Sequence, residues 1–401
     1  MTNIPGTVND GLWRVHAPTE VICGRGVARK AGELVRRVSD GKILLVTDAW
    51  LAKSELLRTI QSSLTYEGLE CEVFDGVEAN PSVAVLEKGI DCLRRTSCET
   101  LLGFGGGSSI DTAKGIAAMA RNSGSILDYE GTGKLQNSAL PIIAIPTTAG
   151  TGSEATASTV FTNTETKFKS VIISPLLFPR LAILDADLTV TLPPEITAAT
   201  GMDALTHAIE SYVSKQANPF SEAVALHAIK LLTGNIEKAF FAGTDIQARQ
   251  EMLIGSFLAG AAFSQSKLGN VHAISHTFGG VFNIPHGIAN AVLLPYVLAF
   301  NARACSEKFI NIASAIGLDV PAKASFHAAW QLVEYVVELN ASLNIPATIA
   351  QLGVSLELMD RMVGDAMRSG NVHVNPRLTT HKDIERIIRS AYEGTFGGLD
   401  K

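Results

Sequence analysis

The sequence predicts a two-part α/β plus all-α fold: a parallel-sheet unit followed by a helical unit. Up to about Asp187, short β-branched runs alternate with stretches of helical periodicity, which is typical of a parallel sheet covered by helices. From Pro193 and Pro194 onward, nearly every segment has apolar residues at i, i+3 and i+4, which is typical of packed helices. We therefore expect an α/β unit over residues 1–190 and a helical unit over residues 191–401.

Length and composition exclude several functional classes. The 401 residues are enough for two units that each bury a core, and a hydrophobic content of 46% with 18% charged residues predicts a folded chain. The net charge of −6 is spread without a basic block, so we expect neither nucleic acid nor membrane as a partner. No apolar run reaches the roughly 18 residues of a membrane helix, and residues 1–10 lack a signal pattern. We expect a cytoplasmic protein whose five cysteines are reduced.

The α/β unit is expected to contain four central strands with helices between them. β-branched apolar runs predict strands at residues 42–47, 71–74, 100–104 and 141–145. Helical periodicity predicts helices at residues 27–38, 51–66, 82–95 and 110–122. Residues 158–184 predict further short strands. Because ligands bind parallel sheets at the carboxyl ends of the strands, the loops that follow these strands are candidate binding elements.

Two of these loops suggest nucleotide binding. Asp48 ends an early strand, where a carboxylate can accept hydrogen bonds from ribose hydroxyls and repel a 2′-phosphate, or can simply cap the next helix. A glycine-rich loop then opens a helix, and such a loop lets a phosphate approach free backbone N–H groups. The loop residues are Gly105, Gly106, Gly107 and Ser108, with Asp111 at the start of the helix. A tight turn without a ligand is the alternative, since neither G-x-G-x-x-G nor the P-loop pattern is present.

The third loop, residues 146–154, is rich in hydroxyls and glycines that can hydrogen-bond a polar ligand. Its candidate binding residues are Thr147, Thr148, Thr151 and Ser153. Two such loops at neighbouring strand ends favour a dinucleotide more than either loop alone. Beyond them, Lys167 and Lys169 could each meet a phosphate or ribose, or could be solvated surface lysines.

In the helical unit, candidate metal ligands fall in two clusters. Asp203 and His207 are four residues apart in a helical run over residues 194–214, so both side chains leave one face of the helix. His272 and His276 have the same spacing, and His286 follows a proline at an expected helix end. One buried histidine alone is more often a core residue, but two clusters favour a metal site. Imidazoles with one carboxylate suit Fe(II), Zn, Ni, Co or Mn in a catalytic role. Any reaction that joins this site to the phosphate loops must occur in the cleft between the units.

Several motifs in a fixed order resemble the iron-containing (group III) alcohol dehydrogenase family over residues 21–392. They are the glycine loop with Asp111 and Lys114, residues 146–154, residues 201–207, His272 with His276, residues 285–291 and residues 375–377. The resemblance implies a dehydroquinate synthase-like fold, with a Rossmann-like NAD(P)-binding domain and a helical metal-binding domain. It also implies reversible hydride transfer between nicotinamide and a short primary alcohol or aldehyde, and a homodimer or higher homo-oligomer.

The resemblance further implies roles for individual residues. The metal ligands would be Asp203, His207, His272 and His286, with His276 near the nicotinamide as a proton-handling residue, so that His276, Asp203 and His272 form the expected catalytic set. The glycine loop would carry the pyrophosphate, and the positions that match Asp48, Asn80, Thr147, Thr148 and Lys169 would line the cofactor. Asp48 then favours NAD over NADP. Fe(II) is the expected metal, and Zn, Mn or Ni would fit the same ligands.

Several alternatives accompany this interpretation. The maleylacetate reductase branch of the superfamily looks metal-free and has Asn at the position of Asp203, so the aspartate argues against that branch. An NAD-dependent lyase or cyclase of the dehydroquinate synthase type, a hydroxyacid dehydrogenase, and a sensor that has lost catalysis are the other candidates. Small or apolar pocket candidates favour a short aldehyde, whereas Lys267 or Arg377 facing the pocket would favour one with an anionic tail. The pocket candidates are Thr156, Phe161, Phe263, Leu268 and Phe278.

Overall fold

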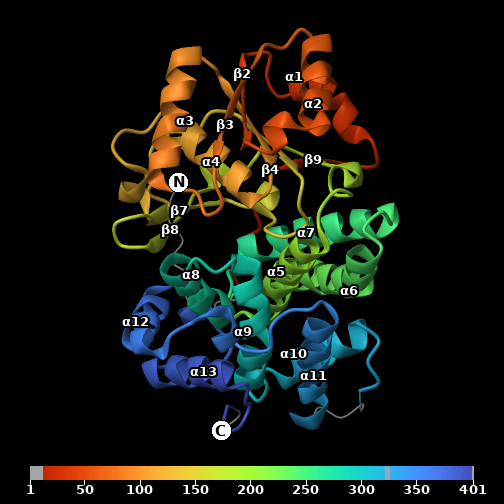
Figure 1. Ribbon diagram of the computed structural model, residues 1–401, viewed down its shortest axis with the longest axis vertical. Coiled ribbons are helices and arrows are strands. Elements are labelled where there is room, and N and C mark those ends of the chain that lie inside the picture. Colours follow the sequence, from red (N-terminus) through yellow and green to blue (C-terminus); the bar gives the residue numbers. More distant parts are fainter. Residues whose placement is uncertain (1–11, 321–325, 400–401) are drawn as a thin grey trace.

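The computed structural model describes residues 12–320 and 326–399, and it separates into two halves that lie one above the other (Figure 1). Residues 20–188, the sheet half, contain every strand of the described residues. Residues 194–320 and 326–393, the helical half, contain helices joined by loops and short 3-10 turns. The predicted succession of an α/β unit and a helical unit is therefore confirmed.

The main sheet has six strands, all parallel, in the order β1-β9-β6-β4-β2-β3. Their bounds are β1 Glu20–Cys23, β2 Ile43–Asp48, β3 Cys71–Val77, β4 Thr100–Gly105, β6 Ile142–Pro146 and β9 Leu181–Leu184. The four predicted strands correspond to β2, β3, β4 and β6, and β3 extends three residues beyond its prediction. Strand order places β6, β4, β2 and β3 side by side, so the loops that follow them share one edge of the sheet.

Helices cover both faces of this sheet because successive strand residues point to opposite sides. Leu45 and Leu102 pack in a core with the helices α1 (Ala31–Arg36) and α2 (Glu55–Tyr66). Leu44 and Leu101 pack in a second core with α3 (Val83–Thr96) and α4 (Gly107–Met119). The predicted helices at 27–38 and 51–66 begin as the 3-10 turns η1 (Val27–Lys30) and η2 (Leu51–Lys53). Helix α4 starts three residues earlier than predicted, because the glycine loop itself forms its first turn.

A smaller sheet connects the two halves. It contains β5 (Gly131–Thr132), β8 (Phe168–Ile173) and β7 (Ser158–Asn163), in that order, with β7 and β8 antiparallel. In Figure 1 the β7–β8 hairpin lies at the boundary, beside α8. Arg361 donates a 2.8 Å hydrogen bond to the carbonyl of Thr166 in the hairpin turn, and the guanidinium of Arg368 lies 4.4 Å from the ring centroid of Phe168. The short strands expected at 158–184 therefore serve as a bridge between the halves.

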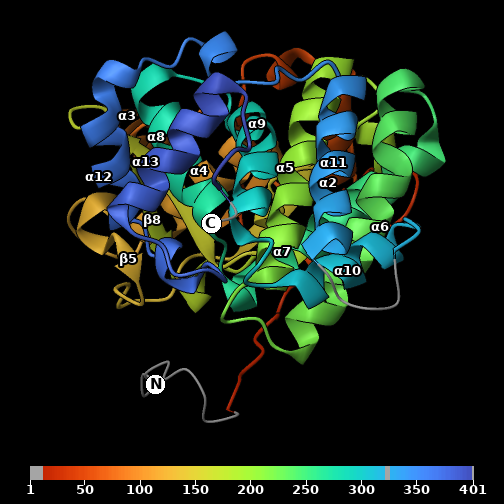
Figure 2. The same ribbon diagram turned by 90° about the horizontal axis from the view of Figure 1, so that it is seen from below.

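The helical half is built around one buried helix, α5. The helices are α5 Pro194–Val213, α6 Pro219–Phe241, α7 Ile246–Ser266, α8 Asn270–Phe282, α9 His286–Asn301, α10 Ser306–Ala315, α11 Phe326–Ser342, α12 Met359–Arg368 and α13 His381–Glu393. Pro194 opens α5 at a position where its missing N–H costs nothing, and Glu195 complements the helix dipole. Helix α5 is buried nearly all round and packs against α6, α7 and α9. Figure 2 shows α5 and α9 between α12 and α13 on one side and α6 on the other.

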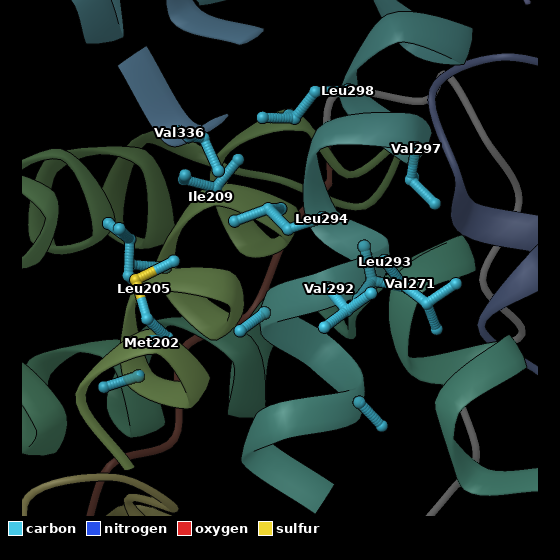
Figure 3. Close-up of a cluster of buried hydrophobic side chains, with 14 of the residues drawn as sticks. Met202, Leu205, Ile209, Val271, Val292, Leu293, Leu294, Val297, Leu298 and Val336 are labelled. Atoms are coloured by element: carbon cyan, nitrogen blue, oxygen red, sulfur yellow. The ribbon is translucent and has the colours of Figure 1, made fainter. Parts of the chain in front are cut away.

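Apolar side chains on α5 and α9 hold these two helices in register (Figure 3). Met202, Leu205 and Ile209 of α5 belong to one buried cluster with Leu294 of α9 and Val336 of α11. Removing a buried Leu, Ile or Met side chain of this kind costs about 2–5 kcal/mol, so the packing strongly fixes the positions of the helices. The polar residues that alternate with these apolar ones on α5 are therefore held at defined positions.

The two halves also meet through glycine backbone. A Cβ atom added to Gly152, which has φ +60°, would lie 2.7 Å from the Cα of Gly260 in α7, and one added to Gly260 would lie 2.6 Å from the carbonyl oxygen of Gly152. Neither position has room for a side chain. None of the described helices is long and apolar enough to span a membrane. All five cysteines are unpaired thiols.

Candidate metal and cofactor site

Three helices bring one carboxylate and three imidazoles to a common point. Asp203 and His207 come from α5, His272 from α8 and His286 from the first residue of α9. The Nε2 atoms of His207, His272 and His286 lie 3.9, 3.8 and 3.9 Å from Oδ1 of Asp203. Ligand atoms of Asp203, His207 and His272 all lie within 4.8 Å of one another. The predicted convergence of the two clusters is present in the structure.

The spacing of the ligand atoms of Asp203, His207 and His272 fits a single metal ion, and Nε2 of His286 lies beside this group, 3.9 Å from Asp203. Nitrogen and oxygen ligands bind transition metals at about 2.0–2.2 Å, which places two ligands of one ion about 3–4 Å apart. The amide nitrogen of Asn290 lies 3.1 and 3.2 Å from Nε2 of His272 and His286, and donates a 2.6 Å hydrogen bond to Oδ1 of Asp203. An amide has two N–H hydrogens, so with one donated to Asp203 the other can be donated to only one of the two ring nitrogens, which must then be unprotonated. An unprotonated ring nitrogen is the form of histidine that binds metal.

Burial favours the neutral form of these histidines. It lowers the pKa of His272 and of His286 well below the usual 6.5, and the charge of Lys169 lowers both further, whereas the charge of Asp203 opposes the decrease at His272. Asp203 is buried at only 3% exposure in the same cluster. A buried carboxylate of this kind is costly unless an opposite charge pairs with it, and a divalent cation would provide that charge.

Glu210 is a second buried carboxylate on the same helix. Its Oε2 lies 2.7 Å from Nδ1 of His272, and its Oε1 accepts a 2.7 Å hydrogen bond from the backbone N–H of Val271. Burial raises the pKa of Glu210 to about 7, and the backbone N–H groups that it binds oppose this increase. The Nδ1 atoms of His207 and His286 are also buried, but they have no hydrogen-bond partner among the described residues.

His276 lies next to the candidate ligands without joining them. It is half-buried on α8, one turn after His272, and its ring stacks on that of His286 with centroids 5.2 Å apart. Burial lowers its pKa well below 6.5, and the charge of Lys169 adds to the effect. His276 is thus a neutral imidazole at the border of the cluster, where it could exchange a proton.

The candidate cofactor residues follow four adjacent strands at one edge of the main sheet. Asp48 ends β2, Asn80 follows β3, Gly105 ends β4 and Thr147 follows β6. Oδ1 of Asp48 accepts hydrogen bonds of 2.9 Å from the backbone N–H groups of Trp50 and Leu51. Asp48 therefore holds the loop after β2, but the next helix, α2, is capped by Ser54 and not by Asp48 as the alternative anticipated; the role of Asp48 toward a ribose stays a prediction.

The glycine loop and the third loop touch each other at this edge. Gly106 is the residue before α4, so the free N–H groups of the helix start face the same edge. A Cβ atom on Gly107 would lie 2.6 Å from Cγ2 of Thr151, and one on Gly106 would lie 3.4 Å from Oγ1 of Thr148. Ser108 lies in the first turn of α4. The backbone is therefore the principal binding surface that these loops can offer to an anion.

Two of the candidate cofactor residues bind each other. Ser153 donates a 2.6 Å hydrogen bond to Oδ1 of Asp111. Oδ2 of Asp111 accepts a 2.9 Å hydrogen bond from the N–H of Val160. Lys114, fully buried, donates to Ser153, Thr156 and Ser158 oxygens at 2.6–3.0 Å. Burial lowers the pKa of Lys114 to about 8, an effect opposed by the charges of Asp111 and Glu154. This network shapes the third loop, and direct contact of Asp111 or Ser153 with a cofactor stays a prediction.

Lys169 connects the cofactor edge to the metal cluster. Its Nζ donates a 2.8 Å hydrogen bond to Oδ1 of Asn80, which has a left-handed backbone with φ +55°. The same Nζ would lie 2.9 Å from a Cβ atom on Gly279, one turn beyond His276 in α8. Burial lowers the pKa of Lys169 to about 8, opposed by the negative charges of Asp203 and Asp111. A buried cation thus lies between the two parts of the site.

The predicted substrate pocket needs correction. Phe161 and Phe278 are fully buried in apolar cores, and Thr156 is bound by Lys114, so these three side chains are not available to a substrate. The prediction failed because apolar residues near a motif are core residues more often than pocket residues. Phe263 does reach the cluster, where its ring stacks on His207 at 4.6 Å. Arg377 donates to carbonyls of Phe300 and Leu399, in the helical core.

Two residues of the site were not anticipated: Glu210 and Asn290. Both follow a candidate ligand at helical spacing, Glu210 three residues after His207 and Asn290 four residues after His286. Residues three or four apart lie on one helix face, so this spacing was a usable signal. The signal was missed because the sequence was searched for metal ligands, and neither Glu210 nor Asn290 was expected to be one.

Comparison with known proteins yields one family. A family described as iron-containing alcohol dehydrogenase matches residues 18–186, and one described as Fe-containing alcohol dehydrogenase family, C-terminal, matches residues 197–392. The chain is 38% identical over 374 residues to an NAD-dependent methanol dehydrogenase of Bacillus methanolicus, covering 93% of this chain and 98% of that protein. It is 41% identical over 363 residues to a 1,3-propanediol dehydrogenase of Klebsiella pneumoniae, covering 90% and 94%. A crystal structure of 1,3-propanediol oxidoreductase superposes with a TM-score of 0.92 at 40% identity, covering 95% of this chain and 100% of that one.

Proposed function

Because this chain belongs to the iron-containing alcohol dehydrogenase family, we propose that it transfers a hydride reversibly between NAD and a short primary alcohol or its aldehyde. It is a metal-dependent alcohol dehydrogenase, and NAD is its nicotinamide cofactor, as in the methanol dehydrogenase relative. The observation that carries the proposal is the convergence of three Nε2 atoms at 3.8–3.9 Å on one oxygen of Asp203. Histidines with a purely structural role would not need to bring three ring nitrogens to one buried carboxylate oxygen.

Asp203, His207, His272 and His286 hold the metal in this proposal. The carboxylate provides charge and the neutral imidazoles provide lone pairs. A divalent metal supplies Lewis acidity toward the substrate oxygen, and the nicotinamide supplies the hydride chemistry. Fe(II) is the first candidate, and the same four residues would accept Zn, Mn or Ni.

His276 moves the alcohol proton. Its imidazole borders the ligand cluster, lies 6.0 Å from His272 between ring centroids, and is neutral at pH 7 because burial lowers its pKa. A neutral imidazole can accept a proton during alcohol oxidation and return it during aldehyde reduction. Its half-buried position gives the proton a path toward solvent.

The edge of the main sheet binds NAD. Backbone N–H groups from Gly105 to Ser108 bind the pyrophosphate, helped by the dipole of α4. Asp48 accepts a ribose hydroxyl hydrogen bond with the oxygen that does not cap its own loop, and its charge disfavours a 2′-phosphate. Lys169 and Asn80 position the nicotinamide end beside α8.

A short, uncharged substrate fits this site best. Phe263 forms an apolar wall beside His207, which excludes water from that side of the reacting atoms. The guanidinium of Arg377 donates to backbone carbonyls of the helical core and lies over Phe300. Aldehydes with an anionic tail and hydroxyacids are therefore secondary candidates.

We also propose that the chain forms two domains, residues 1–190 and 191–401, and that it works in the cytoplasm as a homodimer or a larger homo-oligomer. Five unpaired thiols suit a reducing compartment. Light scattering coupled to size-exclusion chromatography tests the oligomeric state. Fractionation of cells that express the chain tests its location.

Metal exchange with a substrate panel tests the proposed function. The protein is stripped with a chelator and reloaded anaerobically with Fe(II), Zn, Mn or Ni, and NADH absorbance is followed with neutral and anionic short aldehydes. Metal-dependent loss of NADH with neutral aldehydes is the expected result. Binding of metal and NAD without net NADH change on any aldehyde or alcohol would instead favour the lyase or sensor alternatives.

A further inference from the structure

We propose that Glu210 is the positioning residue of the metal site: its carboxylate joins α5 to α8 and keeps the Nε2 lone pair of His272 directed at Asp203. This inference rests on the proposed function, because it assumes that His272 is a metal ligand. Glu210 does not itself face the metal point. It acts through His272 and through the backbone at the start of α8.

Glu210 belongs to the same helix face as two of the proposed ligands. Asp203, His207 and Glu210 occupy positions i, i+4 and i+7 of α5, which lie on one stripe of a helix. The first two approach the metal point, whereas Glu210, almost two turns beyond Asp203, reaches the start of α8. A single helix thus provides two ligands and the support for a third.

One oxygen of Glu210 sets the tautomer of His272. Oε2 lies 2.7 Å from Nδ1 of His272, and in its ionised form the carboxylate can only accept there, which places the ring proton on Nδ1. The lone pair then resides on Nε2, which lies 3.8 Å from Oδ1 of Asp203 and faces the amide of Asn290 at 3.1 Å. The carboxylate therefore keeps His272 in the form that a metal needs.

The other oxygen of Glu210 caps α8. The residue before this helix is Gly269, which has no side chain to satisfy the first N–H groups. Instead, Oε1 of Glu210 accepts a 2.7 Å hydrogen bond from the N–H of Val271. A Cβ atom on Gly269 would lie 2.9 Å from this oxygen, so glycine leaves the space that the carboxylate uses. His272 is thus fixed at its ring and at its helix by one group.

His272 differs in this respect from the other two imidazoles. The Nδ1 atoms of His207 and His286 are buried without a hydrogen-bond partner in the described part of the chain. His207 is held instead between the rings of Phe263 and His272, at 4.6 and 4.5 Å. A carboxylate with only 4% exposure is costly to bury unless donors satisfy it, and the donors here all belong to the start of α8. Positioning α8 accounts for its presence.

The test is Glu210→Gln, which keeps the shape but replaces one acceptor oxygen by a donor NH₂ group. If that group faces His272, the ring proton must move to Nε2 and block the ligand lone pair. If it faces Val271, two donors oppose each other at the helix start. We expect the dissociation constant for Zn, measured by chelator competition on the full chain, to rise about 10–100-fold. NADH binding, followed by fluorescence, should remain as in the wild type.

Two control variants separate positioning from a general loss of charge or of capping. Glu195→Gln makes the same exchange at an exposed residue in the first turn of α5, and it should leave Zn affinity unchanged. Asn375→Ser removes the amide oxygen that accepts a 3.3 Å hydrogen bond from the N–H of Asn270. It therefore weakens the capping of α8 without changing the contact between Glu210 and His272. It should lower the melting temperature while Zn affinity stays near that of the wild type. An equal loss of affinity in Asn375→Ser and Glu210→Gln would overturn the tautomer argument.

A measurement on the unaltered protein covers the case in which Glu210→Gln does not fold. Proton–nitrogen NMR of the Zn-loaded wild type should show the ring proton of His272 on Nδ1, with Nε2 bound to the metal. A proton on Nε2 would refute the proposal. Wild-type affinity in Glu210→Gln would also refute it and leave the proposed function intact. Conversely, tight Zn binding without NADH turnover in the wild type would refute the proposed function, while the affinity comparison would still decide the role of Glu210.

Discussion

The helical half and the sheet half assemble their polar residues in opposite ways. In the helical half, Asp203 and three imidazoles point their acceptor atoms at one another across 3.8–3.9 Å, a distance too long for direct hydrogen bonds. In the sheet half, the polar side chains satisfy each other: Asp111 binds Ser153, and Lys114 binds oxygens of the third loop. In the first arrangement several acceptor atoms share the two hydrogens of one amide, that of Asn290, whereas in the second each of these donors has an acceptor of its own.

This difference indicates how each half binds its ligand. A metal ion is bound by side chains, so the helical half brings a small number of carboxylate and imidazole ligands to one point. A dinucleotide is bound largely by backbone N–H groups, so the side chains of the sheet half are used to shape the loops that present them. Single substitutions should therefore abolish metal binding outright, whereas they should weaken cofactor binding by degrees. The following predictions test this contrast.

Asp203→Ala should have the largest effect. It removes the single negative charge at the metal point, so we expect metal to be lost and turnover to fall by about 1,000-fold or more, since Lewis-acid stabilisation contributes several kcal/mol. Elemental analysis and NADH absorbance measure the two quantities. His227→Ala, at an exposed histidine of α6, is the matched control and should change neither. Stoichiometric metal in Asp203→Ala would disprove the ligand assignment.

Lys114→Met should destabilise the sheet half without removing the metal. The change leaves Glu154 and Asp111 buried without their cation, which costs about 3–5 kcal/mol in comparable buried pairs. Urea denaturation measures the free energy of unfolding. Lys88→Met, at an exposed position of α3, is the control. A variant as stable as the wild type that had lost NADH binding would show that Lys114 contacts the cofactor directly.

His276→Ala should retain metal and lose about 100-fold in turnover, within the range that general acid–base groups contribute. Because the pKa of His276 is lowered below 6.5, the wild type should lose alcohol oxidation only as the pH falls below that value and the imidazole becomes protonated. The pH dependence of alcohol oxidation by the variant should lack this decrease at low pH. Full turnover of the variant across the pH range would eliminate the proton-transfer role.

Lys169 should make NADH binding dependent on pH. Its pKa is lowered to about 8 by burial, so its charge is present below pH 8 and disappears as the pH rises through that value. We expect the dissociation constant of NADH to rise about 10–100-fold above pH 8, since a hydrogen bond to a charged group contributes about 1.5–3 kcal/mol. Fluorescence titration at several pH values tests this. Lys169→Met should bind weakly at every pH, and Lys167→Met should behave like the wild type.

Gly107→Ala should have the smallest effect. The added methyl group would approach Thr151 to 2.6 Å, and the threonine side chain can partly move away. Overpacking of this kind costs about 1–3 kcal/mol, so NADH affinity should fall about tenfold. Gly234→Ala in α6, where nothing lies within 4 Å of the new atom, is the control. A complete loss of NADH binding would contradict the gradual response expected of the sheet half.

The same contrast explains which features were predictable from the sequence. Periodicity located β2, β4, α5 and the two metal clusters, because spacing along a helix or strand determines which side chains share a face. Glu210 has that spacing too, but its partner His272 lies 62 residues away, on another helix. Pairings such as Asp111 with Ser153 depend on how two loops meet, which no local pattern encodes. The pocket prediction failed for Phe161 for the same reason, since its burial depends on Gly115 in α4.

The glycine pair at the boundary has a mechanical consequence. Gly152 follows the cofactor edge and Gly260 lies in α7, and their main chains touch with no side chain between them. A side chain can change rotamer to make room for a neighbour, but main chain packed against main chain cannot. Any residue larger than glycine at either position would therefore push the loop after β6 away from α7, and with it the cofactor edge away from the helical half that holds the metal cluster.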